Sequence, residues 1–376
     1  MDQDLPPVPP APDVGANEFR CPSCAGEMQW DAGAGALRCQ YCEEVVTPPE
    51  SEADASIVEY DLEHGIAMSR QRGYGTPVRT STCQACGATV SFGDNVTATK
   101  CDFCDSPQVM QQEGNRNMLR PESLVPFQIA REVATGKFTT WLGKLWFRPS
   151  DLKHRAEVDD IDGVYVPYWT FDATVDSRWT AQAGYYYYET ERYTERDAQG
   201  NTVTRERQVR KTRWRWANGT RTDLYDDLLV CASRGLPHEL AAKLTSFDTA
   251  HLVPYEPHFL AGWKAEEYAV ELNDAWKTAV ANMQASQHGR CSRDVPGDTQ
   301  RFLSVQNQFH DERFKHVLLP IWIASYRYGD EIYRFLVNGQ TGEVTGKAPL
   351  SWTKIILFAA AIVALIVGTI VLVRSR

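Results

Sequence analysis

Two short stretches of this chain carry the same arrangement of four cysteines. Each stretch has two Cys-x2-Cys pairs, and 14 residues separate the pairs in both (25–38 and 87–100). The eight cysteines are Cys21, Cys24, Cys39, Cys42, Cys83, Cys86, Cys101 and Cys104. A two-residue spacing lets one turn direct both sulfurs at a single point, and two such turns complete a tetrahedron around Zn²⁺. The spacing therefore predicts two zinc ribbons, each holding one zinc ion.

The ligand set of each predicted ribbon favours a structural role for the metal. Four thiolates fill all four positions of a tetrahedral ion, so no position stays open for a substrate or a catalytic water. Residues 1–17 are acidic and Pro-rich with no apolar run, which predicts a disordered arm and no signal peptide. In a reducing compartment, thiols hold metal rather than form disulfides. Disulfides or an iron–sulfur cluster are the alternatives to zinc.

The charge of the chain is concentrated in its cysteine-rich third. The net charge is −10; residues 1–112 hold 17 acidic and 6 basic side chains, and the remainder holds 32 and 33. Nucleic-acid affinity comes mostly from Lys and Arg that neutralise phosphates. Residues 19–45 have only Arg20 and Arg38 against four carboxylates, and residues 81–107 have only Lys100 against three. The charge balance therefore argues against nucleic acid as a partner of either ribbon, and protein partners are expected.

The last stretch of the sequence predicts a membrane span. Residues 355–373 are 19 residues without a charge, which as a helix extend about 28 Å, close to the thickness of a bilayer core. The alternative, a buried core helix, would show a polar face, and this stretch offers only Thr369. Ala360, Ala364 and Gly368 form a stripe of small residues that would let two spans approach closely, as in a homo-oligomer.

Residues 113–350 predict one α+β domain with a largely antiparallel sheet. Segments rich in aromatic and β-branched residues indicate strands, whereas residues 130–147 and 261–286 have the apolar period of helices. The predicted organisation is a disordered arm (1–17), zinc ribbon 1 (18–45), a linker with a short helix (46–80), zinc ribbon 2 (81–112), the α+β domain (113–350) and a C-terminal transmembrane anchor (351–376).

One predicted strand is strongly basic. In "TRERQVRKTRWRW", residues 204–216, one face carries five cations, which are Arg205, Arg207, Lys211, Arg213 and Arg215. This face is a candidate for binding an anionic surface, either lipid headgroups or nucleic acid. The preceding strand carries Glu189, Glu191 and Glu195 on one face, so cross-strand ion pairs are the alternative.

No motif in the sequence predicts catalysis. The two Gly-Lys pairs, in "ATGKFTT" and "VTGKAPLS", lack the first glycine and the Ser/Thr of a P-loop. No H-E-x-x-H or G-x-S-x-G motif is present. The sequence therefore predicts a protein that is not an enzyme.

The arrangement of motifs resembles a known protein family. Two ribbons like those of transcription factor IIB precede "GVYVPYWTFD" (163–172), "LLPIWIASYRY" (318–328) and "YRFLVNGQTGEVTG" (333–346), and a span follows. This order is similar to bacterial membrane proteins that are often labelled as similar to primosomal protein N-prime, a superfamily II helicase. The nucleotide-binding motifs of such a motor are absent. The resemblance implies an anchor for a membrane-stress assembly.

These observations together predict a function at a membrane. We expect a tail-anchored zinc-ribbon scaffold or adaptor, single-pass in the cell inner membrane with the bulk of the chain cytoplasmic, that recruits protein partners there. The alternative is a membrane-tethered nucleic-acid-binding factor, associated with replication or a helicase and without its own motor.

Overall fold

The computed structural model describes residues 19–31, 33–47, 57–68, 79–92, 101, 103, 106, 109–113, 119, 121–150, 152, 157–196, 200–244, 246–328 and 331–374. Cys104, Arg376 and the arm predicted over residues 1–17 lie outside them. The chain divides into two compact units. The body unit comprises Met1–Thr170, Leu229–Ala275 and Lys315–Arg376, and the arm unit comprises Phe171–Leu228 and Trp276–Phe314.

A small antiparallel sheet holds the first cysteine group. Its strands are β1 (Met28–Asp31), β2 (Ala36–Cys39) and β3 (Val45–Val46), in that order. Met28 and Trp30 alternate with half-buried neighbours and pack with Leu37, as expected for strands with one face on a core. A β-hairpin formed by β1 and β2 thus connects the two cysteine pairs.

The other strands belong to one twelve-stranded sheet, which joins β11, β8, β13, β9, β12, β6, β5 and β7 in that order, with β4, β10, β14 and β15 off this path. Their bounds are β4 (Tyr60–Asp61), β5 (Arg79–Cys83), β6 (Thr89–Phe92), β7 (Val109–Glu113), β8 (Ser123–Leu124), β9 (Glu157–Arg196), β10 (Thr202–Cys231), β11 (Val253–Pro254), β12 (Lys264–Glu266), β13 (Thr299–Tyr328), β14 (Glu331–Asn338) and β15 (Val344–Gly346). Antiparallel pairs predominate, as predicted, but β12 with β9 and β13 with β8 are parallel. The predicted fold class agrees with the structure in its coarse features, which are small sheets, a sheet-rich region with few helices and a C-terminal apolar helix.

The helices are α1 (Leu62–Met68), α2 (Arg131–Lys144), α4 (His238–Ala241), α5 (Leu272–Asp294) and α6 (Trp352–Arg374), with 3₁₀ turns η1 (Thr249–His251) and η2 (Pro257–Leu260). The helix predicted over residues 130–147 is α2. The helix predicted over 261–286 is wrong at its start, because residues 264–266 form β12 and α5 begins only at Leu272. Pairing of β12 with both β6 and β9 overrides the local preference for helix.

Aromatic side chains fill one core of the body unit. Phe127 stacks on Trp263, with ring centroids 4.1 Å apart, and meets Trp322 edge-on at 5.1 Å. Gly163 and Gly339 provide the room, since a Cβ at either position would collide with the rings of Trp263 or Phe127. This core places Trp263 where it also contacts the small sheet.

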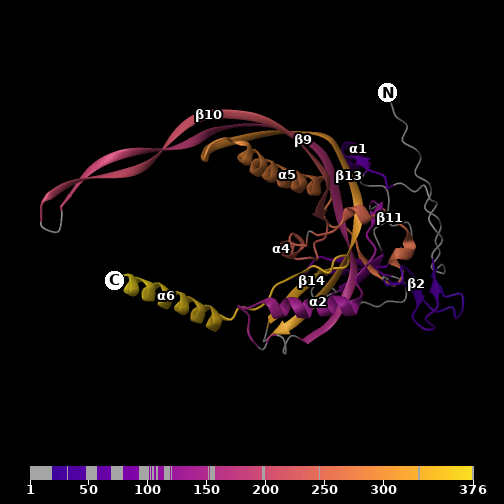
Figure 1. Ribbon diagram of the computed structural model, residues 1–376. Coiled ribbons are helices and arrows are strands. Elements are labelled where there is room, and N and C mark those ends of the chain that lie inside the picture. Colours follow the sequence, from indigo (N-terminus) through magenta and orange to yellow (C-terminus); the bar gives the residue numbers. More distant parts are fainter. Residues whose placement is uncertain are drawn as a thin grey trace, which may run out of the picture. The chain divides into compact units, whose positions relative to one another are not determined.

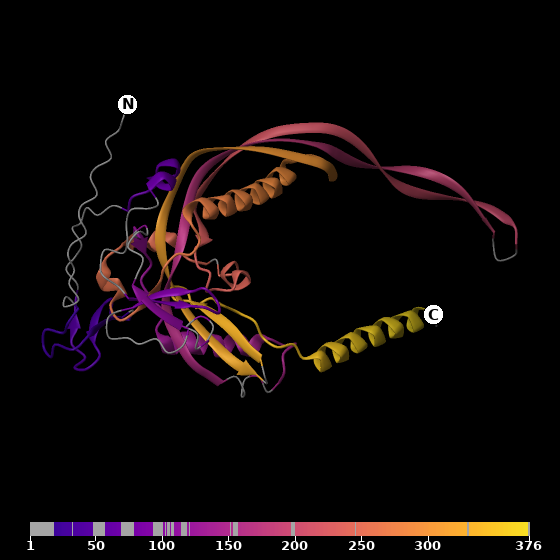
Figure 2. The same cartoon turned by 180° about the vertical axis from the view of Figure 1, so that it is seen from behind.

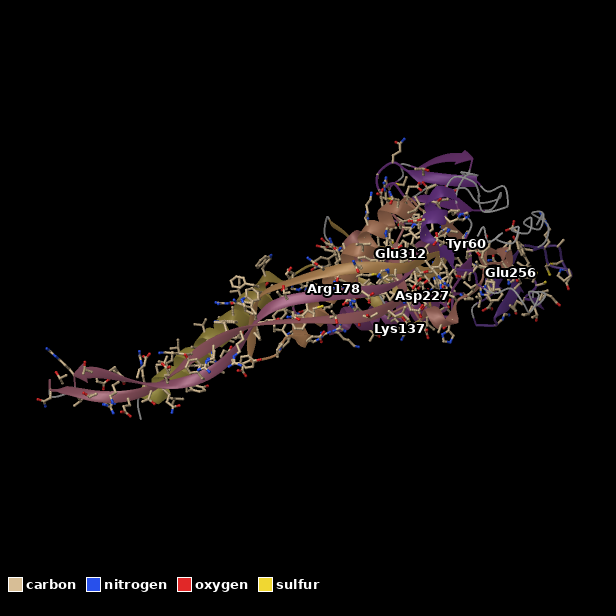
Figure 3. The ribbon with its side chains drawn as sticks, turned by 90° about the horizontal axis from the view of Figure 1, so that it is seen from above. Tyr60, Lys137, Arg178, Asp227, Glu256 and Glu312 are labelled. Carbon is tan, nitrogen blue, oxygen red and sulfur yellow. The ribbon has the colours of Figure 1, made fainter. Side chains whose placement is uncertain are left out.

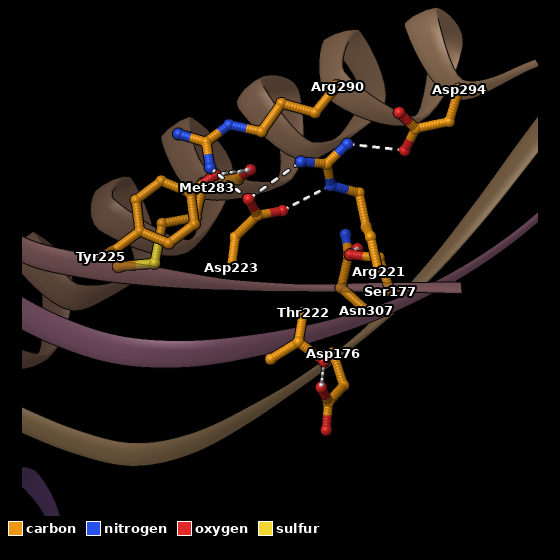
Figure 4. A network of polar contacts seen from close by, with 10 residues as sticks. All are labelled: Asp176, Ser177, Arg221, Thr222, Asp223, Tyr225, Met283, Arg290, Asp294 and Asn307. Atoms are coloured by element: carbon orange, nitrogen blue, oxygen red, sulfur yellow. Dashed lines mark hydrogen bonds and ion pairs between the residues drawn. The ribbon is translucent and has the colours of Figure 1, made fainter. Parts of the chain in front are cut away.

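In the arm unit, β9 and β10 run side by side as a long two-stranded hairpin (Figures 1 and 2). Polar side chains project from it along its length (Figure 3). Near the base of this hairpin, Arg221 bridges Asp223 at 2.5 Å and Asp294 of α5 at 2.6 Å, and Arg290 bonds Asp223 at 2.6 Å (Figure 4). These ion pairs hold α5 on the hairpin and keep the pKa of Asp223 well below its usual range, chiefly through Arg221.

Candidate metal centres

The first cysteine group has the geometry of a closed metal site. The sulfurs of Cys21, Cys24, Cys39 and Cys42 all lie within 4.8 Å of one another. Cys21 and Cys42 are 3.4 Å apart and Cys24 and Cys39 are 3.5 Å apart. Ligands 2.3 Å from a tetrahedral ion are separated by about 3.8 Å. The four sulfurs therefore fit one structural metal ion.

The same backbone hydrogen bond occurs at the first cysteine of every pair. The N–H of the first cysteine donates to the carbonyl five residues later: Cys21 to Gly26, Cys39 to Glu44, Cys83 to Ala88 and Cys101 to Ser106, at 2.8–2.9 Å. The residue after the second cysteine takes a positive φ at Ala25 (56°), Glu43 (61°) and Gly87 (80°). Residues with a side chain rarely adopt this conformation, so Ala25 and Glu43 are strained, whereas Gly87 adopts it freely. A repeated, costly turn is expected where it orients sulfurs.

Backbone donors favour the thiolate form of Cys39. The N–H groups of Cys42 and Tyr41 lower the pKa of Cys39 to about 6. The Glu44 N–H acts in the same direction on Cys42, but the neighbouring sulfurs outweigh it and raise the pKa of Cys42 to about 12. Metal binding requires the thiolate, so the backbone donors lower the cost of losing the proton at Cys39.

The second cysteine group repeats the arrangement as far as the described residues reach. Cys83, Cys86 and Cys101 lie within 4.8 Å of one another, and Cys86 and Cys101 are 3.6 Å apart. Cys104, the fourth predicted ligand, lies outside the described residues. Both groups are thus compatible with structural metal binding, and the identity of the metal is a prediction.

Trp263 and its neighbours join the first cysteine group to the rest of the body unit. The indole N–H of Trp263 donates to the Trp30 carbonyl at 3.0 Å, and the Trp30 N–H donates to Ala261 at 3.0 Å. Phe259 packs edge-on against Trp30 at 4.7 Å. The cysteine group and the aromatic core of the body unit therefore share one residue, Trp263.

The second group is continuous with the large sheet. β6 of this group pairs with β12, and Cys83, Cys101 and Phe103 belong to a buried cluster with residues from β9 and β13. A Cβ on Gly235 would approach Ala88 to 2.5 Å, so the segment after β10 lies directly on this group. This close approach requires glycine at position 235.

The basic strand is largely neutralised in its outer part. Arg205 pairs with Glu195 at 2.6 Å, Arg207 with Glu191 at 3.3 Å, and Lys211 with Glu189 at 2.5 Å. These are the cross-strand ion pairs that the sequence offered as an alternative. Exposed pairs of this kind contribute little stability, but they reduce the charge available to an anionic surface.

The remaining two cations of that face lie in a different environment. Among the residues that the structure describes, Arg213 and Arg215 have no carboxylate partner. They line a hollow of about 300 Å³ with Tyr185, Tyr186 and Tyr187, and the Arg213 guanidinium lies 5.3 Å from the centre of the Tyr187 ring. Anion binding by the five predicted residues stays a prediction, and these two carry it best.

The C-terminal helix has the properties of the predicted span. Within α6, residues Trp352–Leu372 are long and apolar enough to cross a membrane, and none of its most apolar part is buried. A Cβ at Gly368 would meet no atom within 4 Å. Ala360, Ala364 and Gly368 are exposed on α6, so the stripe is free to face lipid or a second copy.

The sequence did not indicate a cluster of three carboxylates in the arm unit. Oxygens of Asp172, Asp226 and Asp227 lie within 4.8 Å of one another, and the Asp227 N–H donates to Asp172 at 2.5 Å. The hairpin separates Asp172 from the other two in sequence, so no spacing could have revealed the cluster.

The exposed aromatic residues Trp146 and Phe147 were also not predicted as functional, because in sequence they resemble the end of an amphipathic helix.

The chain is similar to a known protein along nearly its full length. The chain is 24% identical over 344 residues to uncharacterized protein YdjG of Bacillus subtilis (strain 168), a match over 90% of this chain and 91% of the relative. No protein-family model matches the chain, and no solved structure matches it. The likeness extends over nearly the full length of both proteins.

Proposed function

We propose that this protein is a membrane-anchored scaffold whose two zinc ribbons present surfaces to protein partners on the cytoplasmic side of the cell inner membrane. The observation that carries the proposal is the closed set of four sulfurs in the first cysteine group, because such a site builds a surface and leaves no position for chemistry. The exposed apolar helix α6 supports attachment to the bilayer. A membrane-stress assembly is the setting that the family resemblance favours.

The charge of the first ribbon favours a protein partner over nucleic acid. Arg38 is paired with Asp31 at 2.5 Å, which leaves Arg20 as the other cation of residues 19–45 against Glu27, Glu43 and Glu44. Phosphate binding needs several unpaired cations. The same ribbon exposes Tyr41 (76%) and Val45, and exposed aromatic residues are typical anchors of protein interfaces.

Affinity capture from a nuclease-treated detergent extract tests the proposal. We expect defined protein partners to remain bound to the full-length protein after nuclease treatment. Tyr41→Ser should weaken their capture, whereas Val133→Ser, which changes an exposed apolar residue on α2, should not. Partners that disappear with nuclease would instead favour the alternative, a membrane-tethered nucleic-acid-binding factor. If the Tyr41→Ser variant captures the partners as well as the wild type does, the surface around Tyr41 is not the partner-binding surface.

A further inference from the structure

The loop after α2 exposes two large aromatic side chains. Trp146 is 71% exposed and Phe147 is 37% exposed. Single exposed apolar residues are common on soluble proteins, but a contiguous group of large ones marks a contact surface. Trp352 and Leu350, at the start of the candidate span, are exposed as well. The four residues therefore need a common explanation.

Hydrogen bonds fix this loop beside the beginning of α6. The Ser351 N–H donates to the Phe147 carbonyl at 2.8 Å, and the Arg148 guanidinium donates to the Ala348 carbonyl. Within the loop, the Arg148 N–H donates to Leu145 at 3.2 Å. The loop is thus tied to the segment that leads into the helix, and its aromatic side chains have a defined position relative to α6.

The aromatic side chains of the loop contact Phe358, which lies in the apolar part of α6. Phe358 meets Phe147 edge-on at 5.3 Å and Trp146 at 6.0 Å, and Trp146 stacks on Phe147 at 6.0 Å. Phe358 lies six residues after Trp352, which corresponds to about 9 Å along a helix. If α6 crosses a bilayer, Trp146 and Phe147 lie at the depth where headgroups meet acyl chains.

Charged residues around the loop suit a position in the headgroup layer. Lys144, Arg148 and Lys354 flank the aromatic group and carry the cations that anionic headgroups attract. Trp and basic residues are enriched at membrane interfaces because each has an apolar body and a polar end. A surface for a protein partner would have no need to lie level with the start of the span.

We propose that residues 145–148 enter the interfacial layer of the membrane beside α6, so that the body unit is held against the bilayer at two points. The inference rests on the proposed membrane anchoring by α6. Two contacts restrict the rotation of the body unit about the span, which a single flexible tether would not do. Trp146 and Phe147 are the residues that carry the second contact.

Photo-crosslinking of the full-length protein in liposomes of phosphatidylethanolamine and phosphatidylglycerol tests the inference. A benzophenone amino acid replaces Trp146 in one variant, Leu365 in the middle of α6 in a second, and Tyr41 in a third; all three side chains are strongly exposed. We expect lipid adducts at positions 146 and 365 and none above background at position 41. Retained metal content shows that each variant is folded, and Phe147 is the substitute site if the variant at 146 loses its metal.

The outcomes separate this inference from the anchoring on which it depends. Lipid adducts at 365 without adducts at 146 overturn the loop contact and leave the span intact. Absence of lipid adducts at both positions overturns the anchoring and the loop contact together. Protein adducts at 146, with a second copy or another chain, also overturn the inference, because the aromatic group then faces protein.

Discussion

The buried carboxyl group of Glu266 makes the stability of the body unit depend on pH. Glu266 lies on β12, the strand that joins the second cysteine group to β9, and its side chain is fully buried. It accepts a hydrogen bond from the Ser233 hydroxyl at 2.9 Å and a weaker one from the Gly235 N–H at 3.4 Å. Burial outweighs these bonds and raises the pKa of Glu266 to about 8, from 4.5.

The direction of the pH effect follows from this raised pKa. Below about pH 4.5 the carboxyl group is neutral in both folded and unfolded chains, so its contribution to stability is fully present. As pH rises from 4.5 to 8, the unfolded chain loses the proton first and folding becomes less favourable. A difference of 3.5 pKa units, at 1.36 kcal/mol each, corresponds to a loss on the order of 5 kcal/mol.

Glu266→Gln removes this titration while keeping an oxygen that accepts from Ser233. We expect the variant to unfold at higher urea concentration than the wild type at pH 9. The difference in free energy of unfolding between the two should fall to about 1 kcal/mol or less at pH 5. Cys231, whose pKa burial raises to about 12, is present in both proteins, so its effect cancels in the comparison. The measurement is urea unfolding of the detergent-solubilised protein at several pH values.

A control and a clear negative result complete this test. Glu132→Gln changes an exposed carboxylate on α2 of the same unit and should leave the pH dependence unchanged. A difference between wild type and Glu266→Gln that stays constant from pH 5 to pH 9 would refute the reasoning, since it would mean that Glu266 does not gain or lose its proton on unfolding.

Four further predictions address the remaining sites. Elemental analysis of the purified protein should find about two zinc ions per chain, and Cys24→Ser should lose one of them; a wild-type ratio near one or zero would contradict the two-ribbon proposal. Asp223→Asn should destabilise the arm unit by about 2 kcal/mol, because it removes charged hydrogen bonds to the half-buried Arg221 and Arg290; the wild type should lose the same contribution as pH falls below 4, and unchanged unfolding would argue against the network. Gly368→Leu fits without a clash inside the chain, so loss of a crosslinked dimer would support packing between spans and an unchanged dimer would exclude it. Reversing Arg213 and Arg215 to Glu in a chain without residues 351–376 should weaken co-sedimentation with anionic liposomes about tenfold or more, whereas undiminished binding would remove lipid contact from the hollow.

The features that sequence reasoning could predict are local ones. The cysteine spacing indicates a repeated local turn, and the same hydrogen bond, from the first cysteine to the carbonyl five residues later, is present at all four pairs. The ion pairs of the hairpin follow from the alternation of side chains along two neighbouring strands, with Arg205 opposite Glu195 as a direct instance. The apolar helix follows from its length and composition.

The features that could not be predicted depend on contacts between distant segments. β12 has the composition of a helix start, and only its pairing with β6 and β9 makes it a strand. The contact of Trp263 with Trp30 joins residues 233 positions apart in sequence. Nothing local in either segment indicates that contact, because many surfaces would bury an indole equally well.

The position of the cysteine groups in the body unit decides which experiments can test their role in binding partners. Cys83 and Cys101 lie in the same buried cluster as core residues of the large sheet, and Cys39 packs in the cluster that includes Trp263. Loss of a metal ion would therefore disturb the core as well as a ribbon surface, since metal binding is coupled to folding. A cysteine variant that fails to capture a partner cannot distinguish an unfolded body unit from a lost contact. Tyr41→Ser changes an exposed side chain and leaves the sulfurs in place, so it tests the ribbon surface alone.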